Sequence, residues 1–186
     1  MGSAPQMDEI PQRLSFDEWV SLFGSGTRSL AHLEMRDSYL VDYEDERYKR
    51  WVAGGRTGPL PREDHPWWRL TTETTARGVS MRRARVVSEP VSEYIAFEYA
   101  GTWQNLESGE QVRWLPRSRA SAIAFPGNDF WLVDGERVLF LLFDGTGRPI
   151  GRQLCTDDAV VTLCSTAFEQ VWGLGTDHAD YQLPVR

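Results

Sequence analysis

The sequence predicts a mixed α/β (α+β) fold in which helices flank one mixed β-sheet. Short apolar segments recur between residues 79 and 155, some alternating and some continuous, as β-strands do. One helical segment separates the first two, which indicates parallel pairing, and tight turns separate the later ones, which indicates antiparallel pairing. The chain has 186 residues, 41% of them apolar, enough for one globular unit with its own core.

A helix and a strand are expected near the N-terminus. Residues 15–23 begin with a capping box formed by Ser15 and Glu18, and their apolar side chains recur at helical spacing. Residues 30–43 alternate in polarity, with His32 among the polar positions, so we assign them to a strand.

The middle of the chain is predicted to form a helix, a loop with one helix in it, a strand and a further helix, in that order. Residues 44–55 form a helix closed by two glycines, and residues 56–78 hold three prolines and form a loop with one helix. Residues 79–88 alternate as a strand. Residues 89–109 follow as one helix with Pro90 in its first turn, where proline is tolerated.

Four strands and a helix complete the prediction. The four strands are residues 111–116, 129–134, 137–144 and 149–155. The apolar run Val138–Phe143 does not alternate, so its strand is expected to be covered on both faces. The last helix spans 156–173, with Thr156 as its cap and Gly173 as its end.

This order divides the chain into four segments of one globular unit. We expect a flexible tail at 1–13 and an N-terminal helical and strand extension at 14–78 packed on the core. The α/β core follows at 79–175, with a C-terminal tail at 176–186.

Composition excludes several classes of function. The net charge of −7 disfavours direct nucleic-acid binding. No apolar run is long enough to cross a membrane, and the N-terminus lacks the basic start and apolar segment of a secretory signal. Only two cysteines are present, which predicts a reduced, cytoplasmic protein without disulfides. Phosphate-loop and dinucleotide motifs do not occur, so we expect no cofactor.

The element order and residues 127–134, GNDFWLVD, resemble a phospholipase D-like half-domain. In active members of that family the segment carries His-x-Lys-x-x-x-x-Asp, where the His attacks phosphorus and the Lys neutralises phosphate oxygens. Here Gly127 takes the His position and Asp129 the Lys position, and only Asp134 matches. The resemblance therefore implies the fold without the usual phosphodiester hydrolysis, because a carboxylate at Asp129 repels phosphate.

A second resemblance covers most of the chain. Its segments are HLEMRDSY, RVVSEPVSEYIAFE, GEQVRWLPR and GNDFWLVD. They are similar to an actinobacterial family of unknown function, whose members are often encoded beside helix-turn-helix regulators. The similarity implies a soluble, cytoplasmic protein with a regulatory role.

Two clusters are candidate sites. One is a ligand-binding cluster of arginine, tryptophan and aspartate, expected at the carboxyl edge of the sheet, where small polar ligands or peptide ends bind. Its members are Arg113, Trp114, Arg117, Asp129, Trp131 and Asp134. The alternative is that Trp131 belongs to the core and the Arg–Asp pairs are structural.

The other cluster is acidic. Glu89, Glu93 and Glu98 interleave with aromatic residues where a helix follows a strand, a place where ligands collect in α/β sheets. The alternative is a solvated helix face, with salt bridges to Arg82, Arg83 or Arg85. If the chain is an enzyme, the candidate catalytic residues are Glu89, Glu93, Asp129 and Asp134, acting as general acids and bases.

Histidine and cysteine are expected to be structural. His32 has no second imidazole or thiolate at metal-ligand spacing, so we predict no metal site and a hydrogen-bonded His32. Cys155 and Cys164 fall on core positions, which predicts buried, unreactive thiols.

Two functional hypotheses follow, and a third is less favoured. The first is a non-catalytic accessory or regulatory module that binds a protein partner, such as a helix-turn-helix regulator, or a small polar ligand. The second is an enzyme that uses the carboxylate, arginine and tryptophan pocket on a small metabolite of a biosynthetic pathway. In the third, two copies form a homodimer with a shared phosphodiesterase site, which would require the His and Lys that are missing here.

Overall fold

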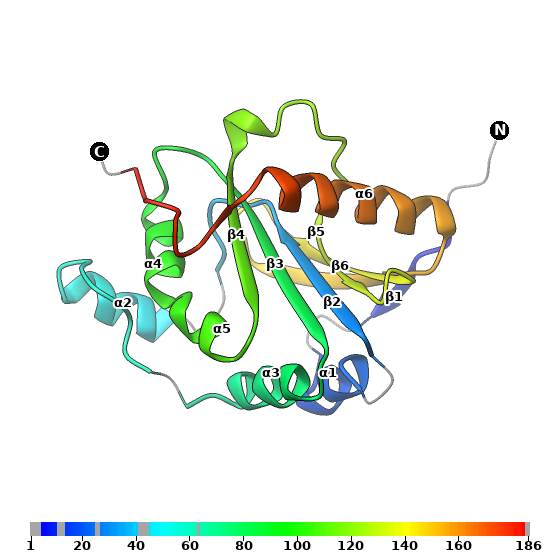
Figure 1. Cartoon of the computed structure of the whole chain (residues 1–186), viewed down its shortest axis with the longest axis horizontal. Helices are drawn as coiled ribbons and strands as arrows, with labels where there is room; N and C mark the ends of the chain where they lie inside the picture. The colour runs from blue at the N-terminus through cyan, green and yellow to red at the C-terminus, as the bar shows by residue number, and fades with distance from the viewer. Residues whose placement is uncertain (1–4, 11–13, 25–26, 41–44, 63, 185–186) are drawn as a thin grey trace.

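The computed structural model is an eight-stranded mixed sheet with helices on both faces (Figure 1). It describes residues 5–10, 14–24, 27–40, 45–62 and 64–184. The strands are β1 (Asp8–Ile10), β2 (Ser29–Glu34), β3 (Ser80–Val87), β4 (Gln111–Pro116), β5 (Asp129–Val133), β6 (Arg137–Phe143), β7 (Pro149–Cys155) and β8 (Thr176–Asp177). Their order in the sheet is β1-β7-β6-β5-β2-β3-β4-β8. Strands β2, β3 and β4 are parallel, and the remaining pairs are antiparallel.

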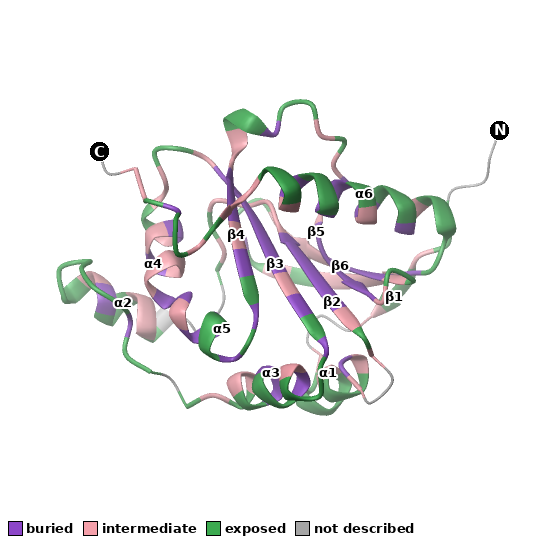
Figure 2. Ribbon diagram, in the orientation of Figure 1, coloured by how far each residue is buried: buried purple, intermediate pink, exposed green. Residues whose placement is uncertain are grey.

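Six α-helices lie in the described part of the chain. They are α1 (Phe16–Leu22), α2 (Asp45–Ala53), α3 (Pro66–Ala76), α4 (Glu93–Gly101), α5 (Trp103–Glu107) and α6 (Asp158–Leu174). In Figure 1, α6 crosses one face of the sheet, while α1 and α3 lie side by side at one end of the molecule and α4 and α5 flank β4. Figure 2 shows that buried residues concentrate in the central strands.

The face under α6 is an apolar core. Strand residues such as Leu33, Ala84 and Phe130 pack there against a stripe of α6 that includes Cys164 and Phe168. The helical spacing of apolar residues in 156–173 predicts most of this stripe, but Leu163 of the predicted stripe is exposed and Val161, outside it, is buried. Both cysteines are buried, as predicted, and burial beside Cys155 raises the pKa of the Cys164 thiol to about 12. A thiol with that pKa stays protonated and unreactive at neutral pH.

The opposite face is apolar only at its two ends. At one end Phe23, the C-cap residue of α1, and Leu70 of α3 form a cluster with Trp131. At the other end α4 packs Ile95 against Trp114 of β4. Strand β6 is covered on both faces, as predicted, because Phe140 faces α6 while Leu139 joins the cluster of α1 and α3.

The boundaries of two predicted helices were wrong. Asp157, and not Thr156, caps α6 by accepting hydrogen bonds from the next helical N–H groups, and α6 continues through Gly173 to Leu174. The predicted helix 89–109 is two helices, α4 and α5, because the chain turns at Thr102. Pro90 lies outside α4, whose cap is Ser92.

The predicted division of the chain also changes. Residues 8–10 of the expected tail form β1, which pairs with β7, whereas residues 1–4 and 11–13 lie outside the described residues. Strand β2, from the expected extension, lies between β5 and β3 in the middle of the sheet. It ends at Glu34, earlier than the predicted 30–43. The C-terminal segment contributes β8.

None of the helices in the described ranges is both long enough and apolar enough to cross a membrane.

Candidate functional site

Two neighbouring rows of polar side chains cross the middle of the sheet, on the face opposite α6. Strand register places Trp131, His32 and Arg83 side by side on β5, β2 and β3. Two residues further along these strands, the same face carries Asp129, Glu34 and Arg85, in the same order. Alternation along each strand directs both rows away from the apolar core. The charged rows therefore lie between the two apolar ends of this face.

The arginines of these rows are bound by carboxylates that are buried or partly buried. Glu34 accepts hydrogen bonds from both Arg83 and Arg85. Arg83 also donates to Glu110, with 2.9 Å between Nε and Oε1, and Arg85 also donates to Glu98, with 2.6 Å between Nη2 and Oε2. The Arg85–Glu98 pair is one of the salt bridges expected under the alternative interpretation of the acidic cluster. Although burial alone raises the pKa of Glu34, the two guanidiniums outweigh it and lower that pKa well below its usual range.

His32 is buried without a hydrogen-bond partner. It is 6% exposed, and its ring stacks on Trp131 with 4.2 Å between ring centroids. Among the described residues neither ring nitrogen has a hydrogen-bond partner, and the closest carboxylate oxygen, Oε1 of Glu34, lies 3.6 Å from Nδ1. The prediction of a hydrogen-bonded His32 was therefore wrong. Burial and the charge of Arg83 lower the pKa of His32 well below 6.5, so the imidazole is neutral at neutral pH.

Asp129, the first residue of the central strand β5, is buried and hydrogen-bonded. One carboxylate oxygen accepts a hydrogen bond from the backbone N–H of Met35 at 2.9 Å, and the other accepts from the Tyr39 hydroxyl at 2.5 Å. Burial raises the pKa of Asp129 to about 7, and the negative charge of Glu34 acts in the same direction. Two neighbouring carboxylates therefore have widely separated pKa values, a pattern that is frequent where proton transfer or ligand binding occurs.

A cavity of about 510 Å³ lies above these rows. His32, Glu34, Arg83, Arg85 and Asp129 line it. Its apolar walls come from α1, α3, α4 and β6 and include Trp19, Trp67, Phe97, Leu141 and Phe143. The cavity occupies the part of this face between the helices that cover its two ends.

The structure separates the predicted ligand-binding cluster. Asp129 and Trp131 line the cavity. Arg117 lies close to Asp129, since its guanidinium donates to the carbonyl of Met35, the residue whose N–H binds Asp129. Trp114 is fully buried beneath Tyr181, with 5.4 Å between the ring centroids.

Two members of that cluster lie elsewhere. Arg113 points to the α6 face, where it donates to the carbonyl of Trp172 at 2.8 Å. Asp134 follows the far end of β5 and accepts hydrogen bonds from the backbone N–H groups of Arg28 and Ser29. The expectation that all six residues share one edge was therefore wrong, because alternation sends Arg113 to the other face and the length of β5 separates Asp134 from Asp129.

The glutamates of the second cluster are also dispersed. Glu89 accepts a hydrogen bond from the Tyr181 hydroxyl at 2.7 Å. Glu93 is about half exposed and pairs with Arg56. Of this cluster, Glu98 lines the cavity.

Most of the charged residues of the site were not predicted from the sequence. Glu34, Arg83, Arg85 and Glu110 were not predicted as site residues, and Tyr39 was not singled out. One signal was available: Arg83 and Arg85 occupy alternate positions of one strand, and His32 and Glu34 repeat that spacing in another. Two strands with charges on the same alternate positions indicate a buried polar surface when both strands are central.

Comparison with protein families matches residues 17–183 to the family described as Domain of unknown function (DUF6879). The chain belongs to this family. No curated protein matches this DUF6879 chain.

Comparison with solved structures supports the phospholipase D-like fold. Nuc, a phospholipase D family member from Salmonella typhimurium, matches with a TM-score of 0.53 and 14% identity over 92% of this chain and 95% of that chain. TrmBL2, an archaeal chromatin protein with a novel mode of DNA binding, matches with a TM-score of 0.49 and 11% identity over 94% of this chain and 54% of that one. The likeness to Nuc extends well beyond residues 79–175, so the N-terminal segment is part of the same fold.

Proposed function

We propose that this DUF6879 chain is a binding module that holds a small molecule in the cavity, in contact with His32. One observation carries the proposal: a buried imidazole lines a sizeable cavity with neither nitrogen hydrogen-bonded to a described residue. An unsatisfied buried polar group costs about 1–3 kcal/mol. A bound ligand that donates a hydrogen bond to His32 would remove this cost.

The shape and lining of the cavity support a small ligand. A volume of about 510 Å³ lies within the range of pockets for cofactors and metabolites. Trp19, Trp67 and Trp131 give aromatic walls that suit a planar or apolar ligand body. A few polar groups on the floor are suited to fix its orientation.

The same floor argues against a phosphodiester substrate. Arg83 and Arg85 are each bound by two carboxylates, so their charges are compensated before any ligand arrives. Asp129 adds a further carboxylate. A phosphate placed here would meet more negative charge than positive charge. The earlier predictions of a protein partner, such as a helix-turn-helix regulator, and of a homodimer stay predictions and are not needed for this function.

A second candidate function is acid–base catalysis on the bound molecule. Asp129, with a pKa of about 7, and neutral His32 line one cavity, so one side chain could donate a proton and the other could accept one. Of the four predicted catalytic carboxylates, Asp129 lines the cavity, and its acidic neighbour there is Glu34.

Native mass spectrometry of the intact protein from its own organism tests the proposal. We expect the wild-type protein to carry a non-covalent small molecule and His32→Phe, which keeps a ring but loses both nitrogens, to lose it. Glu136→Gln, an exposed residue paired with Arg28, is the control and should keep the ligand. Equal occupancy in wild type and His32→Phe would contradict the proposal. If the purified protein chemically converts the molecule that it carried, catalysis would be favoured.

A further inference from the structure

The charge network at the floor of the cavity has one more negative charge than positive. Its carboxylates are Glu34, Glu98 and Asp129, which line the cavity, and Glu110, which binds Arg83 from outside the lining. Its guanidiniums are Arg83 and Arg85, which line the cavity, and Arg36, whose charge acts on Asp129. Nearby Arg117 does not change the balance, since it lies 3.8 Å from Asp37 and these two charges offset each other.

Two other arginines, Arg47 and Arg152, also line the cavity. Arg152 of β7 lies over the ring of Trp19, where Glu18 acts on it electrostatically. Arg47 of α2 donates to the side chain of Gln104 at 2.7 Å. Neither is among the principal charges that act on Asp129 or His32. The negative excess therefore belongs to the network around Asp129 and not to the lining as a whole, in which four arginines accompany three carboxylates.

In the free protein, a proton on Asp129 can neutralise this excess. That proton must come from solvent, and the pKa of Asp129 near 7 shows that the group holds it only partly at neutral pH. A bound cation would supply the missing positive charge instead. His32 lies on the next row of the same face, and its neutral ring can accept a hydrogen bond from such a cation.

The aromatic walls are also suited to a cation. The Arg36 guanidinium already lies 5.4 Å from the Phe143 ring centroid, and that of Arg83 lies 5.6 Å from the Trp131 centroid. Tyr39, bonded to Asp129, packs against Phe143 with 5.2 Å between ring centroids. Ring faces beside a carboxylate attract positive charge electrostatically.

We propose that the ligand of this cavity carries one positive charge on a protonated amine, bound by Asp129 and His32, with an aromatic or apolar body against the tryptophan walls. This inference rests on the proposed function and names the chemical class of the ligand. Four observations support it: the excess of carboxylates in the network around Asp129, an unpartnered buried imidazole, aromatic rings next to Asp129, and a cavity large enough for a metabolite.

Three probes of similar shape and different charge test the inference by isothermal titration calorimetry. They are phenethylamine, 2-phenylethanol and 3-phenylpropionate. We expect the amine to bind at least about tenfold more tightly than the alcohol, and the acid to bind most weakly, because charge is the main difference among them. Equal affinity of the alcohol or the acid overturns the inference and leaves the proposed function standing.

The pH dependence adds a second readout. The amine stays protonated from pH 6 to pH 8, while Asp129 loses its proton around pH 7. The Kd of phenethylamine should therefore fall about tenfold over this range, whereas that of 2-phenylethanol should stay constant. A constant Kd for the amine would contradict a role for Asp129.

A matched pair of variants locates the effect. Asp129→Asn should remove both the preference for the amine and its pH dependence, and Asp134→Asn, the same change beyond the other end of β5, should preserve both. If no probe binds at millimolar concentration, the inference is overturned. If native mass spectrometry then also finds no ligand, the proposed function fails as well.

Discussion

The two faces of the sheet are built on different principles. Under α6, strand residues and the helix stripe form a continuous apolar core around Phe130 and Phe168. On the opposite face, apolar packing is confined to the ends, and two charged rows occupy the middle. The first face can be stabilised by burial alone, whereas the second depends on how well its charges are matched.

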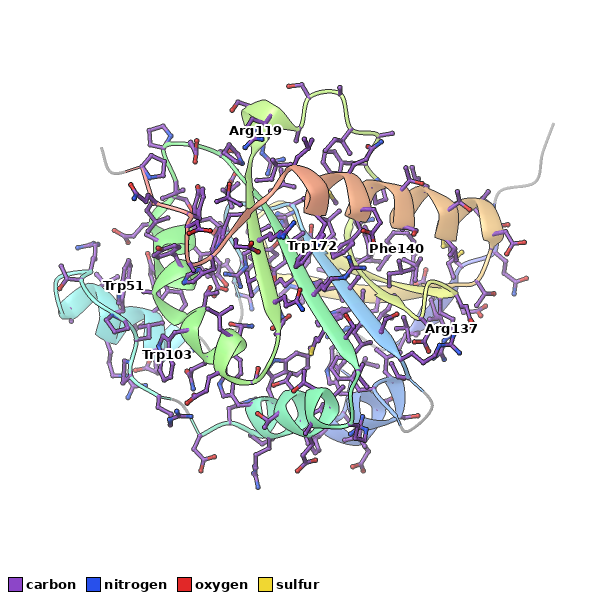
Figure 3. The ribbon with its side chains drawn as sticks, in the orientation of Figure 1. Trp51, Trp103, Arg119, Arg137, Phe140 and Trp172 are labelled. Carbon is purple, nitrogen blue, oxygen red and sulfur yellow. The ribbon has the colours of Figure 1, made fainter. Side chains whose placement is uncertain are left out.

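Consecutive residues of β3 show the contrast. Arg82 faces α6, is 25% exposed at its side chain, and pairs with Glu169, which is 54% exposed. Its guanidinium lies over the ring of Trp172, as that of Arg113 does from β4. Trp172, which is labelled in Figure 3, is in the last turn of α6. Arg83 faces the cavity, is 8% exposed, and pairs with Glu34 and Glu110. Two consecutive residues of one strand therefore form a solvated ion pair and a buried one.

The largest effect is expected from Glu34→Gln. This change leaves Arg83 and Arg85 buried with fewer carboxylates, and breaking a buried ion pair costs about 3–5 kcal/mol. Urea denaturation at pH 7 measures the loss in the free energy of unfolding. A loss below about 1 kcal/mol would show that the buried charges are not energetically coupled.

The next effect is expected from Asp129→Asn, and it depends on pH. Burial raises the pKa of Asp129 to about 7, so the folded state holds this proton more tightly than the unfolded chain does. Wild-type stability should therefore decrease as pH rises from about 4 to 7, by about 2–3 kcal/mol between pH 5 and 8. The asparagine variant should lack this decrease. Parallel stability profiles of the two proteins would refute the assignment.

His32→Phe should stabilise the ligand-free protein by about 1–2 kcal/mol, because it removes buried nitrogens without partners. It should also remove the loss of stability that wild-type His32 causes below pH 6.5, where the unfolded chain gains a proton that the folded state excludes. His178→Phe is the matched control. His178 accepts a hydrogen bond from the Trp114 indole N–H at 3.1 Å, so its loss should destabilise by about 1 kcal/mol. Destabilisation by both changes would indicate that His32 is structural.

The smallest effect is expected from Glu169→Gln on the α6 face. Exposed ion pairs contribute about 0.2–1 kcal/mol, and salt screens them. The change should therefore lower stability slightly in low salt and hardly at all in 0.5 M NaCl. An effect as large as that of Glu34→Gln would remove the contrast between the two faces.

Secondary structure could be predicted from the sequence where local signals are strong. The capping box of α1, the strand β3 and the helix α6 with most of its apolar stripe were confirmed. The break between α4 and α5, the Asp157 cap and strand β1 were missed, because tertiary contacts or single hydrogen bonds decide these features.

The candidate site could be predicted only in part. Asp129 and Trp131 were identified and line the cavity. Arg113 and Asp134 were predicted beside them, but Arg113 lies on the α6 face of the sheet and Asp134 lies beyond the opposite end of β5. Glu34 and Arg85 are 51 residues apart in the chain and meet only because β2 and β3 pair in one particular register. No local pattern specifies that register.

The sequence by itself determined which residues alternate within each strand, because side-chain direction has a period of two along any extended chain. It thereby placed His32 with Glu34, and Arg83 with Arg85, on common faces. Only the tertiary structure decided that these faces are one surface, that they lie beneath a cavity, and that His32 is left without a hydrogen bond. Those outcomes depend on strand order and on where the helices pack, which arise from contacts between distant segments.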